Sequence, residues 1–313
     1  MISQNNPFDI NNHLAYASWR DKKRECQPQT SAALIVDVKD PRKLSEDEKI
    51  ALLTLCNDAN MAIYRSPITS VDKNIPRQLA AQLGMKQLDC NWLADEDGIS
   101  PIAVANTVES TTHTSGKTPR RVMIPYTNLP IKWHTDGYYQ PQDRNINGMV
   151  LHCVRPALSG GETAVIDHEM VYIAMREANP NWVAALMAND AMTIPARTDE
   201  DGVARAEQSG PVFSVDPHSG ALHMRYTARK RSIAWKSDTV TQEAVQFLEQ
   251  FLASDSPSIF RLKLEPGMGL VCNNVLHDRT GFADDPDKPR LLYRARFLDR
   301  VSKFNDQIWL QPA

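Results

Sequence analysis

The stretch Ile131-Lys-Trp-His-Thr-Asp-Gly-Tyr-Tyr-Gln140 places an imidazole and a carboxylate two residues apart, at His134 and Asp136. On an extended strand, residues i and i+2 point to the same face, so both side chains can reach one point. A neutral imidazole, a carboxylate and a second imidazole from elsewhere form the facial triad that binds iron(II) and leaves coordination positions open. The stretch therefore predicts two of three ligands of an iron site on a β-rich fold.

The pair alone is weak evidence, because 8 His and 38 acidic residues in 313 positions produce about one His-x-Asp/Glu by chance. A third ligand is needed, and His277 is the candidate. It lies in Cys272-Asn-Asn-Val-Leu-His-Asp-Arg-Thr-Gly-Phe282, just past a predicted strand. With this distal imidazole the sequence contains a full ligand set.

Three arginines follow the distal histidine on the last predicted strand, at Arg290, Arg294 and Arg296. Strand alternation places them on one face. A dicarboxylate co-substrate needs a fixed bidentate cation, which arginine provides better than lysine. The alternative is an ordinary strand face whose arginines are solvated or ion-paired.

Composition is ordinary for a folded protein, with 42% hydrophobic and 23% charged residues. The length and the absence of a composition break predict a single domain over 1–313. Within it, residues 1–30 are expected to form a peripheral arm that wraps the surface or frays. Residues 121–300, in round numbers, are expected to form the β-rich core with a helical insert.

The net charge is −3 and no Lys/Arg tract stands out, so neither nucleic acid nor an acidic membrane surface is expected as a partner. No apolar run approaches the ~18 residues of a membrane span, and the start of the sequence shows no signal-peptide pattern. The five Cys are widely spaced without a C-x-x-C pair. A reduced cytoplasmic location is therefore expected.

The coarse element pattern is many short strands with helices inserted between them. Ser45 and Glu48 form a capping-box pattern that predicts a helix over 45–58, and 195–220 reads as loop. Further helices are expected at 76–85, 168–177, from 180 onward and at 241–253. Strands are expected at 32–38, 61–65, 149–154, 163–166, 221–227, 258–264, 269–272 and 291–298. With no regular βαβ rhythm, this pattern favours a β-sandwich or jelly roll with helical decoration.

The ordered motifs resemble the taurine-dioxygenase/TfdA superfamily of Fe(II)/2-oxoglutarate-dependent oxygenases. The family pattern is H-x-D, a Thr or Ser about 25 residues later, a distal His, and an Arg about a dozen residues beyond it. His134, Asp136, Thr163, His277 and Arg290 match it in order. The match covers residues 126–298, and the four spaced elements together are far more specific than any one of them.

This resemblance implies a double-stranded β-helix fold (jelly roll, cupin-like) and the cofactors Fe(II), 2-oxoglutarate and O2. It also implies that His134, Asp136 and His277 bind the metal. Arg290 would pair with the far carboxylate of 2-oxoglutarate and Thr163 would hydrogen-bond the same group. Arg294 is the rival for that role, or a substrate contact, because relatives differ in which of two arginines four apart does this.

Within the superfamily, Leu151-His-Cys-Val154, Gly160-Gly-Glu-Thr-Ala-Val-Ile-Asp167 and Tyr126-Thr127 resemble the catalytic domain of gamma-butyrobetaine and trimethyllysine hydroxylases. Their amino-terminal zinc-binding domain has no counterpart, since Cys26 has no partner ligands nearby. His277-Asp-Arg-Thr-Gly-Phe282 is similar to the distal segment of clavaminate synthase. The resemblance therefore predicts the chemistry and leaves the substrate open.

Aromatic residues cluster around the metal motif at Tyr126, Trp133, Tyr138 and Tyr139, where a cage for a quaternary ammonium group would fit. Wall or core packing is the alternative for each of them. Arginines further along are candidates for a carboxylate or sulfonate, with exposed charge as the alternative: Arg225, Arg229 and Arg231.

The sequence thus predicts an oxygenase that hydroxylates an unactivated C–H bond of a small polar metabolite and releases succinate and CO2. The same iron site can also produce desaturation or C–N or C–S cleavage. A jelly-roll sensor that holds metal and 2-oxoglutarate without turnover is the alternative from another class. The expected partner is a small-molecule substrate, with a homo-oligomer possible for this fold.

Overall fold

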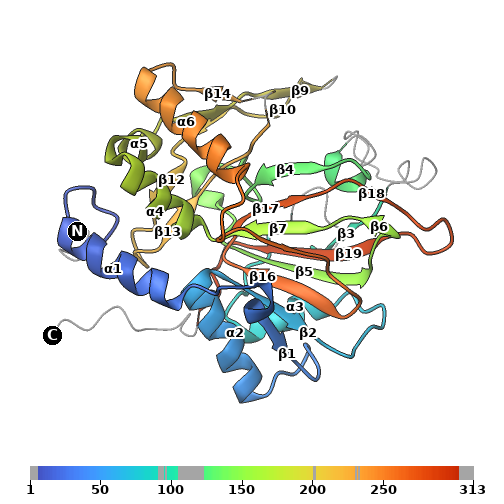
Figure 1. The fold of residues 1–313 in the computed structure, drawn as a ribbon. Coiled ribbons are helices and arrows are strands. Elements are labelled where there is room, and N and C mark those ends of the chain that lie inside the picture. Colours follow the sequence, from blue (N-terminus) through green and yellow to red (C-terminus); the bar gives the residue numbers. More distant parts are fainter. Residues whose placement is uncertain are drawn as a thin grey trace.

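The computed structural model describes residues 6–90, 95, 97–104, 123–199, 202–229, 231 and 233–302. Two sheets form its centre (Figure 1). The larger sheet has the strand order β1 (Ile35–Asp37), β2 (Met61–Arg65), β16 (Met268–Cys272), β5 (Gly148–Arg155), β19 (Leu291–Phe297) and β3 (Ser100–Ile102). The smaller sheet has the order β15 (Phe260–Leu262), β7 (Thr163–Ile166), β17 (Leu276–Arg279) and β4 (Ile131–His134).

The two sheets pack face to face through apolar side chains. Val165 of β7 and Phe260 of β15 belong to one buried cluster with Met149 and Cys153 of β5 and Leu292 of β19. On the strands of the larger sheet, the side chains between these residues, such as Val150 and Tyr293, point to the opposite face, away from the smaller sheet. Because β5 is covered on both faces, its sequence is apolar almost throughout rather than alternating.

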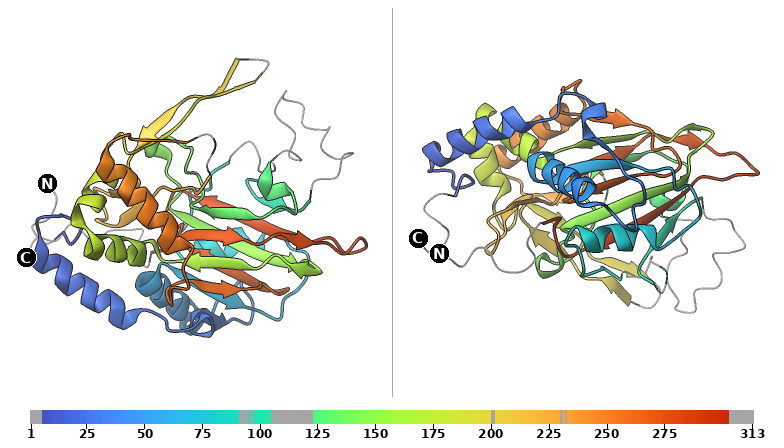
Figure 2. Two further views of the ribbon diagram at one scale, coloured as in Figure 1. Left: turned by 45° about the horizontal axis from the view of Figure 1, so that its top comes forward. Right: turned by 90° about the horizontal axis from the view of Figure 1, so that it is seen from below.

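Helices cover the outer face of the larger sheet, as the view from below shows (Figure 2). α2 (Glu46–Ala59) and α3 (Ile75–Gln82) pack their leucines against Val150, Val271 and Tyr293 in a second buried cluster. The predicted capping box begins α2, since Ser45 accepts from the Glu48 amide and Glu48 accepts from the Ser45 amide. The helix expected over 45–58 is thus confirmed.

A helical insert lies between β7 and β15 and packs at one end of the sheets (Figure 1). Its helices are α4 (His168–Ala178), α5 (Pro180–Leu186) and α6 (Thr239–Leu252). Its strands are β8 (Met192–Ile194), β9 (Arg197–Asp199), β10 (Gly202–Arg205), β11 (Gln208–Gly210), β12 (Phe213–Val215), β13 (Leu222–Met224) and β14 (Ala234–Trp235). The pair β6 (Ser159–Gly160) and β18 (Phe282–Ala283) completes the strands of the described residues.

The expected class, mostly β with inserted helices, is confirmed, and most predicted elements are present within a few residues. Two predictions differ. The segment 195–220 holds short antiparallel strands where a loop was expected. These strands are held by backbone hydrogen bonds, and their sequence lacks the alternation of apolar and polar residues by which a strand is predicted. The first part of the strand expected at 32–38 is instead a 3-10 turn, Ser31–Leu34, capped by the Thr30 hydroxyl. No helix among the described residues is long and apolar enough to cross a membrane.

The amino-terminal arm does not fray within its described part, residues 6–30. It forms α1 (His13–Cys26), whose Tyr16 packs with Phe8 against the insert. Lys23 is buried and forms ion pairs with Asp167 at 2.6 Å and with Glu169 at 2.5 Å. Asp167 is also the residue that caps α4. The arm is therefore docked by charge at the start of the insert.

Replacing Lys23 with Met should lower the free energy of unfolding by about 3 kcal/mol, because Asp167 and Glu169 would remain buried without their cation. Urea unfolding of the whole chain measures this. Arg24→Met is the matched control, since Arg24 is half exposed where it pairs with Glu177; its loss should cost less than about 1 kcal/mol. Equal losses in the two variants would contradict the assignment of α1 docking to Lys23.

Candidate metal centre

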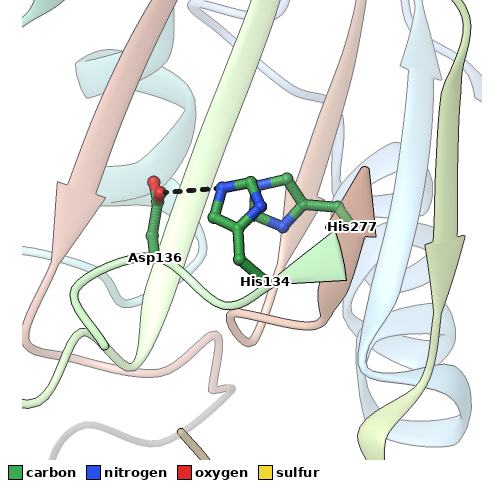
Figure 3. Close-up of side chains that lie close together, drawn as sticks. All are labelled: His134, Asp136 and His277. Atoms are coloured by element: carbon green, nitrogen blue, oxygen red, sulfur yellow. Dashed lines mark ion pairs between the residues drawn. The ribbon is translucent and has the colours of Figure 1, made fainter. Parts of the chain in front are cut away.

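Three side chains from two segments of the chain, β4 with the turn after it and β17, meet at one point (Figure 3). β4 and β17 are antiparallel neighbours, and His277 lies directly opposite His134 in their register. The two imidazole rings have centroids 4.2 Å apart. His134 Nε2 lies 3.8 Å from Asp136 Oδ1, and one ligand atom from each of the three residues lies within 4.8 Å of the others. The structure thus brings the predicted ligand set together.

The expected reason for this meeting was wrong. His134 is the last residue of β4, and Asp136 follows in a turn rather than on the strand. The turn contains Gly137 at φ +71°, where a Cβ would also come within 2.4 Å of the Ile146 side chain. The two ligands therefore converge because the chain bends sharply after β4, and not because of strand alternation.

Asn274 holds this turn in place and was missed by the sequence reasoning. Its Oδ1 accepts from the Asp136 amide at 2.8 Å, while its Nδ2 donates to the Asp136 carbonyl at 2.9 Å and to the Ile146 carbonyl at 2.6 Å. Asn274 itself has φ +50°, a conformation that Asn adopts more readily than most residues. An Asn just before a ligand strand was the available signal.

Both histidines are oriented through Nδ1. The Lys132 carbonyl lies 2.9 Å from Nδ1 of His134, and the Val275 carbonyl lies 3.0 Å from Nδ1 of His277. A carbonyl oxygen can only accept, so each Nδ1 carries a proton, and Nε2 is the nitrogen of each ring that can bind a metal. Burial, together with the neighbouring His277, lowers the pKa of His134 to about 3. Neutral imidazoles with free Nε2 atoms are what a metal requires.

Asp136 is ionised and incompletely hydrogen-bonded. Burial alone would raise its pKa, but Arg294 and Arg296 hold the pKa of Asp136 well below its usual range. Oδ1 accepts from Arg294 Nη1 at 3.1 Å, whereas the buried Oδ2 has no hydrogen-bond partner among the described residues. A buried carboxylate beside two imidazoles, with one oxygen that accepts no hydrogen bond from the described residues, fits a divalent cation. The residues present therefore suit iron(II).

A cavity of about 50 Å³ opens beside His134 and His277. Its apolar wall comes from both sheets, and its polar wall includes Thr163, Arg290 and Arg294 together with His134 and His277. Thr163 and Arg290 are both buried, and Nη1 of Arg290 has no hydrogen-bond partner among the described residues. Burial also lowers the pKa of Arg290. The cavity therefore extends from the two histidines to the Arg290 guanidinium, which forms no ion pair with the described residues.

The three arginines near the last strand differ in their partners. All three are buried, so the solvated alternative is wrong for them. Arg294 pairs with Asp136, and Arg296 pairs with Asp89 at 2.6 Å and donates to the Tyr139 hydroxyl at 3.0 Å. The guanidinium of Arg290 forms no ion pair in the described part of the chain. Each of the three keeps one buried guanidinium nitrogen without a hydrogen-bond partner among the described residues, so the missing ion pair is what distinguishes Arg290.

The residues suggested for substrate do not form one cage. Tyr126 is buried in the apolar cluster between the sheets. Tyr138 and Tyr139 are half-buried just after Asp136 and contact each other edge to face at 5.3 Å. Arg231 is exposed, and none of these four residues is among those that line the cavity.

Replacing Asn274 with Gly keeps the positive φ accessible and removes the three bonds that hold the Asp136 turn. We expect Fe(II) or Mn(II) to bind roughly 10- to 100-fold more weakly, as for other groups that orient a metal ligand. Metal titration by calorimetry measures this. Asn60→Gly is the matched control, since Asn60 also has positive φ but bonds Asp167 instead. Unchanged metal affinity in the Asn274 variant would contradict the role of this amide.

Comparison with known proteins identifies the family. Residues 24–296 match the family model described as taurine catabolism dioxygenase TauD, TfdA family. A uridine-5'-phosphate dioxygenase from Streptomyces sp is 32% identical over 176 residues, 55% of this chain and 62% of that protein. A trimethyllysine dioxygenase from Meyerozyma guilliermondii is 23% identical over 192 residues, 58% of this chain and 46% of that protein. The matched part thus spans about half to three fifths of these curated relatives.

Among solved structures, an asparagine oxygenase in complex with Fe(II), 2S,3S-3-hydroxyasparagine and succinate has a similar fold. Its TM-score is 0.56 at 13% identity, over 90% of this chain and 91% of that chain. The family confirms the resemblance read from the motifs and the expected cofactors, iron(II), 2-oxoglutarate and O2. Since the family model covers most of its length, this chain belongs to the TauD/TfdA family of dioxygenases.

Proposed function

We propose that this chain is an Fe(II)/2-oxoglutarate-dependent oxygenase that hydroxylates an unactivated C–H bond of a small polar metabolite and releases succinate and CO2. One observation carries the proposal. His134, Asp136 and His277 form a complete triad whose carboxylate has one oxygen without a partner among the described residues, and the two histidines line a cavity that Arg290 also lines. Such a pairing of open metal ligands and a free buried guanidinium suits a dicarboxylate that also chelates the metal.

His134, Asp136 and His277 would hold the metal through two Nε2 atoms and a carboxylate oxygen. When bound, iron(II) with 2-oxoglutarate supplies the activation of O2 that oxidises the substrate C–H bond. The protein itself fixes both imidazoles through the Lys132 and Val275 carbonyls. It also keeps the site largely dry, since all three ligands are less than 10% exposed. Orientation and exclusion of water are its contributions.

Arg290 and Thr163 are proposed to hold the far carboxylate of 2-oxoglutarate. Both side chains line the same cavity as the two histidines, and the buried Nη1 of Arg290 has no partner in the described part of the chain. Arg294 is the less suitable rival, because its Nη1 already donates to Asp136. We assign to Arg294 the positioning of the Asp136 carboxylate instead. In this proposal Arg290 contacts the co-substrate and Arg294 supports the metal ligand Asp136.

The two packed sheets with an insert are proposed to be the double-stranded β-helix core of a single domain. The substrate is proposed to be a small polar molecule. The two curated relatives are named for a phosphate ester and for a trimethylated amine, and both kinds of molecule belong to this broad class. Desaturation or C–N or C–S cleavage would use the same residues in the same places.

Succinate formation across a panel of small amines, amino acids, sulfonates and phosphate esters tests turnover. At least one compound should raise succinate above the background measured without substrate, and His134→Ala or Asp136→Ala should abolish both signals. The panel should include metal-free protein and protein with iron restored. If 2-oxoglutarate binds but no compound raises succinate, the non-catalytic sensor becomes the better description.

The division of labour between the two arginines has its own test. Arg290→Gln should raise the 2-oxoglutarate concentration for half-maximal succinate formation by at least about tenfold, because a charged hydrogen bond of roughly 1.5–3 kcal/mol is lost. Arg294→Gln should mainly weaken metal binding, since it leaves Asp136 without its donor. Steady-state kinetics and metal titration of both variants separate the effects. A larger rise in the 2-oxoglutarate requirement for Arg294→Gln would reverse the assignment.

A further inference from the structure

A second group of arginines lies beside the metal centre, outside the cavity that holds Arg290. Arg205, Arg225 and Arg229, here called the arginine cluster, surround the dipeptide Tyr138-Tyr139 that follows Asp136 in the chain. Arg205 ends β10 and Arg225 directly follows β13, and all three lie in the insert between β7 and β15. The function of this cluster is not explained by metal or co-substrate binding.

The cluster is placed next to the metal ligands by backbone pairing. Thr227 forms an isolated bridge with His134, and the Thr135 amide donates to the Tyr226 carbonyl at 3.0 Å. Thr227 is thus paired with the metal ligand His134. Arg225 lies two residues before Thr227 and Arg229 lies two residues after it. Two residues of extended chain span roughly 7 Å. A ligand at the cluster would thus be near the reacting centre.

Arg225 serves as a buried support. Its Nε donates to the Tyr138 carbonyl at 2.7 Å, its Nη1 to the Met192 carbonyl at 3.0 Å and its Nη2 to the Gln208 carbonyl at 2.8 Å. These bonds satisfy the guanidinium with neutral acceptors, so its charge is not compensated. The side chain fixes the tyrosine pair and contributes positive potential.

The other two arginines keep donors for a ligand. Arg229 is exposed, and one Nη1 donates to the Tyr138 hydroxyl at 3.0 Å, while its Nε and Nη2 make no hydrogen bond to the described residues. Arg205 is half-buried and lies over the Tyr139 ring, 5.8 Å from its centroid. Its Nη2 donates to the Pro195 carbonyl at 2.6 Å and its Nη1 to the Tyr139 carbonyl at 3.5 Å, whereas its Nε makes no hydrogen bond to the described residues. The two tyrosines therefore hold the two guanidinium groups at the edge of the site.

No carboxylate of the described residues forms an ion pair with Arg205, Arg225 or Arg229, whose hydrogen-bond acceptors are carbonyl and hydroxyl oxygens. Burial, followed by repulsion from Arg205, lowers the pKa of Arg225 to about 10. Burial also lowers the pKa of Arg205, and repulsion from the charges of Arg197 and Arg229 lowers it further. Positive charge gathered in this way is costly unless an anion joins it.

Resting on the proposed oxygenase function, we propose that the arginine cluster is a substrate subsite that binds a phosphate monoester, with Arg205 and Arg229 contacting its oxygens. A dianion matches several uncompensated guanidinium groups better than a monoanion does, and their forked donors fit phosphate oxygens. The same charges disfavour a quaternary ammonium group at Tyr138 and Tyr139. The substrate is therefore an anionic, phosphate-bearing metabolite, not a cationic one.

Calorimetric titration of the full chain loaded with Mn(II) and N-oxalylglycine tests the subsite. The probes are inorganic phosphate and three pairs: uridine 5'-monophosphate and uridine, phosphoserine and serine, phosphoethanolamine and ethanolamine. At least one phosphate-bearing member should bind about tenfold more tightly than its partner, and added salt should weaken it. Arg229→Gln and Arg205→Gln should each reduce that preference about tenfold, and inorganic phosphate should weaken in parallel.

Arg77→Gln is the matched control, because Arg77 is an exposed guanidinium on α3 that also donates to a backbone carbonyl, that of Asp97. It should keep the full preference. Equal binding within every pair, or an undiminished preference in Arg229→Gln, overturns the subsite. Tighter binding of cysteate or aspartate than of every phosphate overturns the phosphate assignment.

Failure of the subsite and failure of the oxygenase proposal give different results. The absorption of the Fe(II)–2-oxoglutarate chelate and the succinate formed without substrate depend on the metal centre and not on Arg229. Their absence in the unmodified chain counts against the proposed function. Their presence together with phosphate-independent binding counts against the arginine cluster alone. Melting temperatures of the variants check that each remains folded.

Discussion

The antiparallel pairing of β4 with β17 is the constraint on which the metal centre depends. It places His134 opposite His277 although the two residues are far apart in the chain. Directly opposed residues on such strands have Cβ atoms about 5 Å apart, which is close enough for two imidazoles to share one ion. The turn after β4 then needs only to direct the Asp136 carboxylate toward the two imidazoles. A one-residue slip in this register would separate the ligands.

The larger sheet supplies the second half of the site. β19 faces the smaller sheet with Leu292, Arg294 and Arg296, while its odd-numbered neighbours Tyr293 and Ala295 pack under the helices. A buried arginine is tolerated when an acidic side chain or a bound anion compensates its charge. Arg294 meets Asp136, Arg296 meets Asp89, and Arg290 is left with spare donors. The sandwich therefore separates supporting arginines from binding ones.

Much of this arrangement was predictable from the sequence. The ordered His134, Asp136, Thr163, His277 and Arg290 define the family, and strong local signals such as the Ser45 capping box define several elements. The roles of Arg290 and Arg294 were not separable, because both have the same residue type and nearly the same strand position. Their difference arises from tertiary partners.

Asn274, the docked arm and the arginine cluster were less accessible to sequence reasoning for a related reason. Asn274 acts through backbone atoms of a segment far away in the chain, and no local pattern reports such a contact. The polar composition of residues 1–30 hid a helix that is held by one buried lysine. Arg225 and Arg229 were visible as charges, but only the fold shows that no carboxylate of the described residues pairs with them.

The contact between Lys23 and Asp167 also has a consequence for how the chain folds. Lys23 lies in the first helix, and its partner is the residue at which β7 passes into the insert. Closing so long a loop costs entropy that is repaid only after the sheets exist. We therefore expect α1 to dock late, after β7 and α4 have formed. During synthesis α1 would have no partner for Lys23 until Asp167, about half of the chain later, had been added.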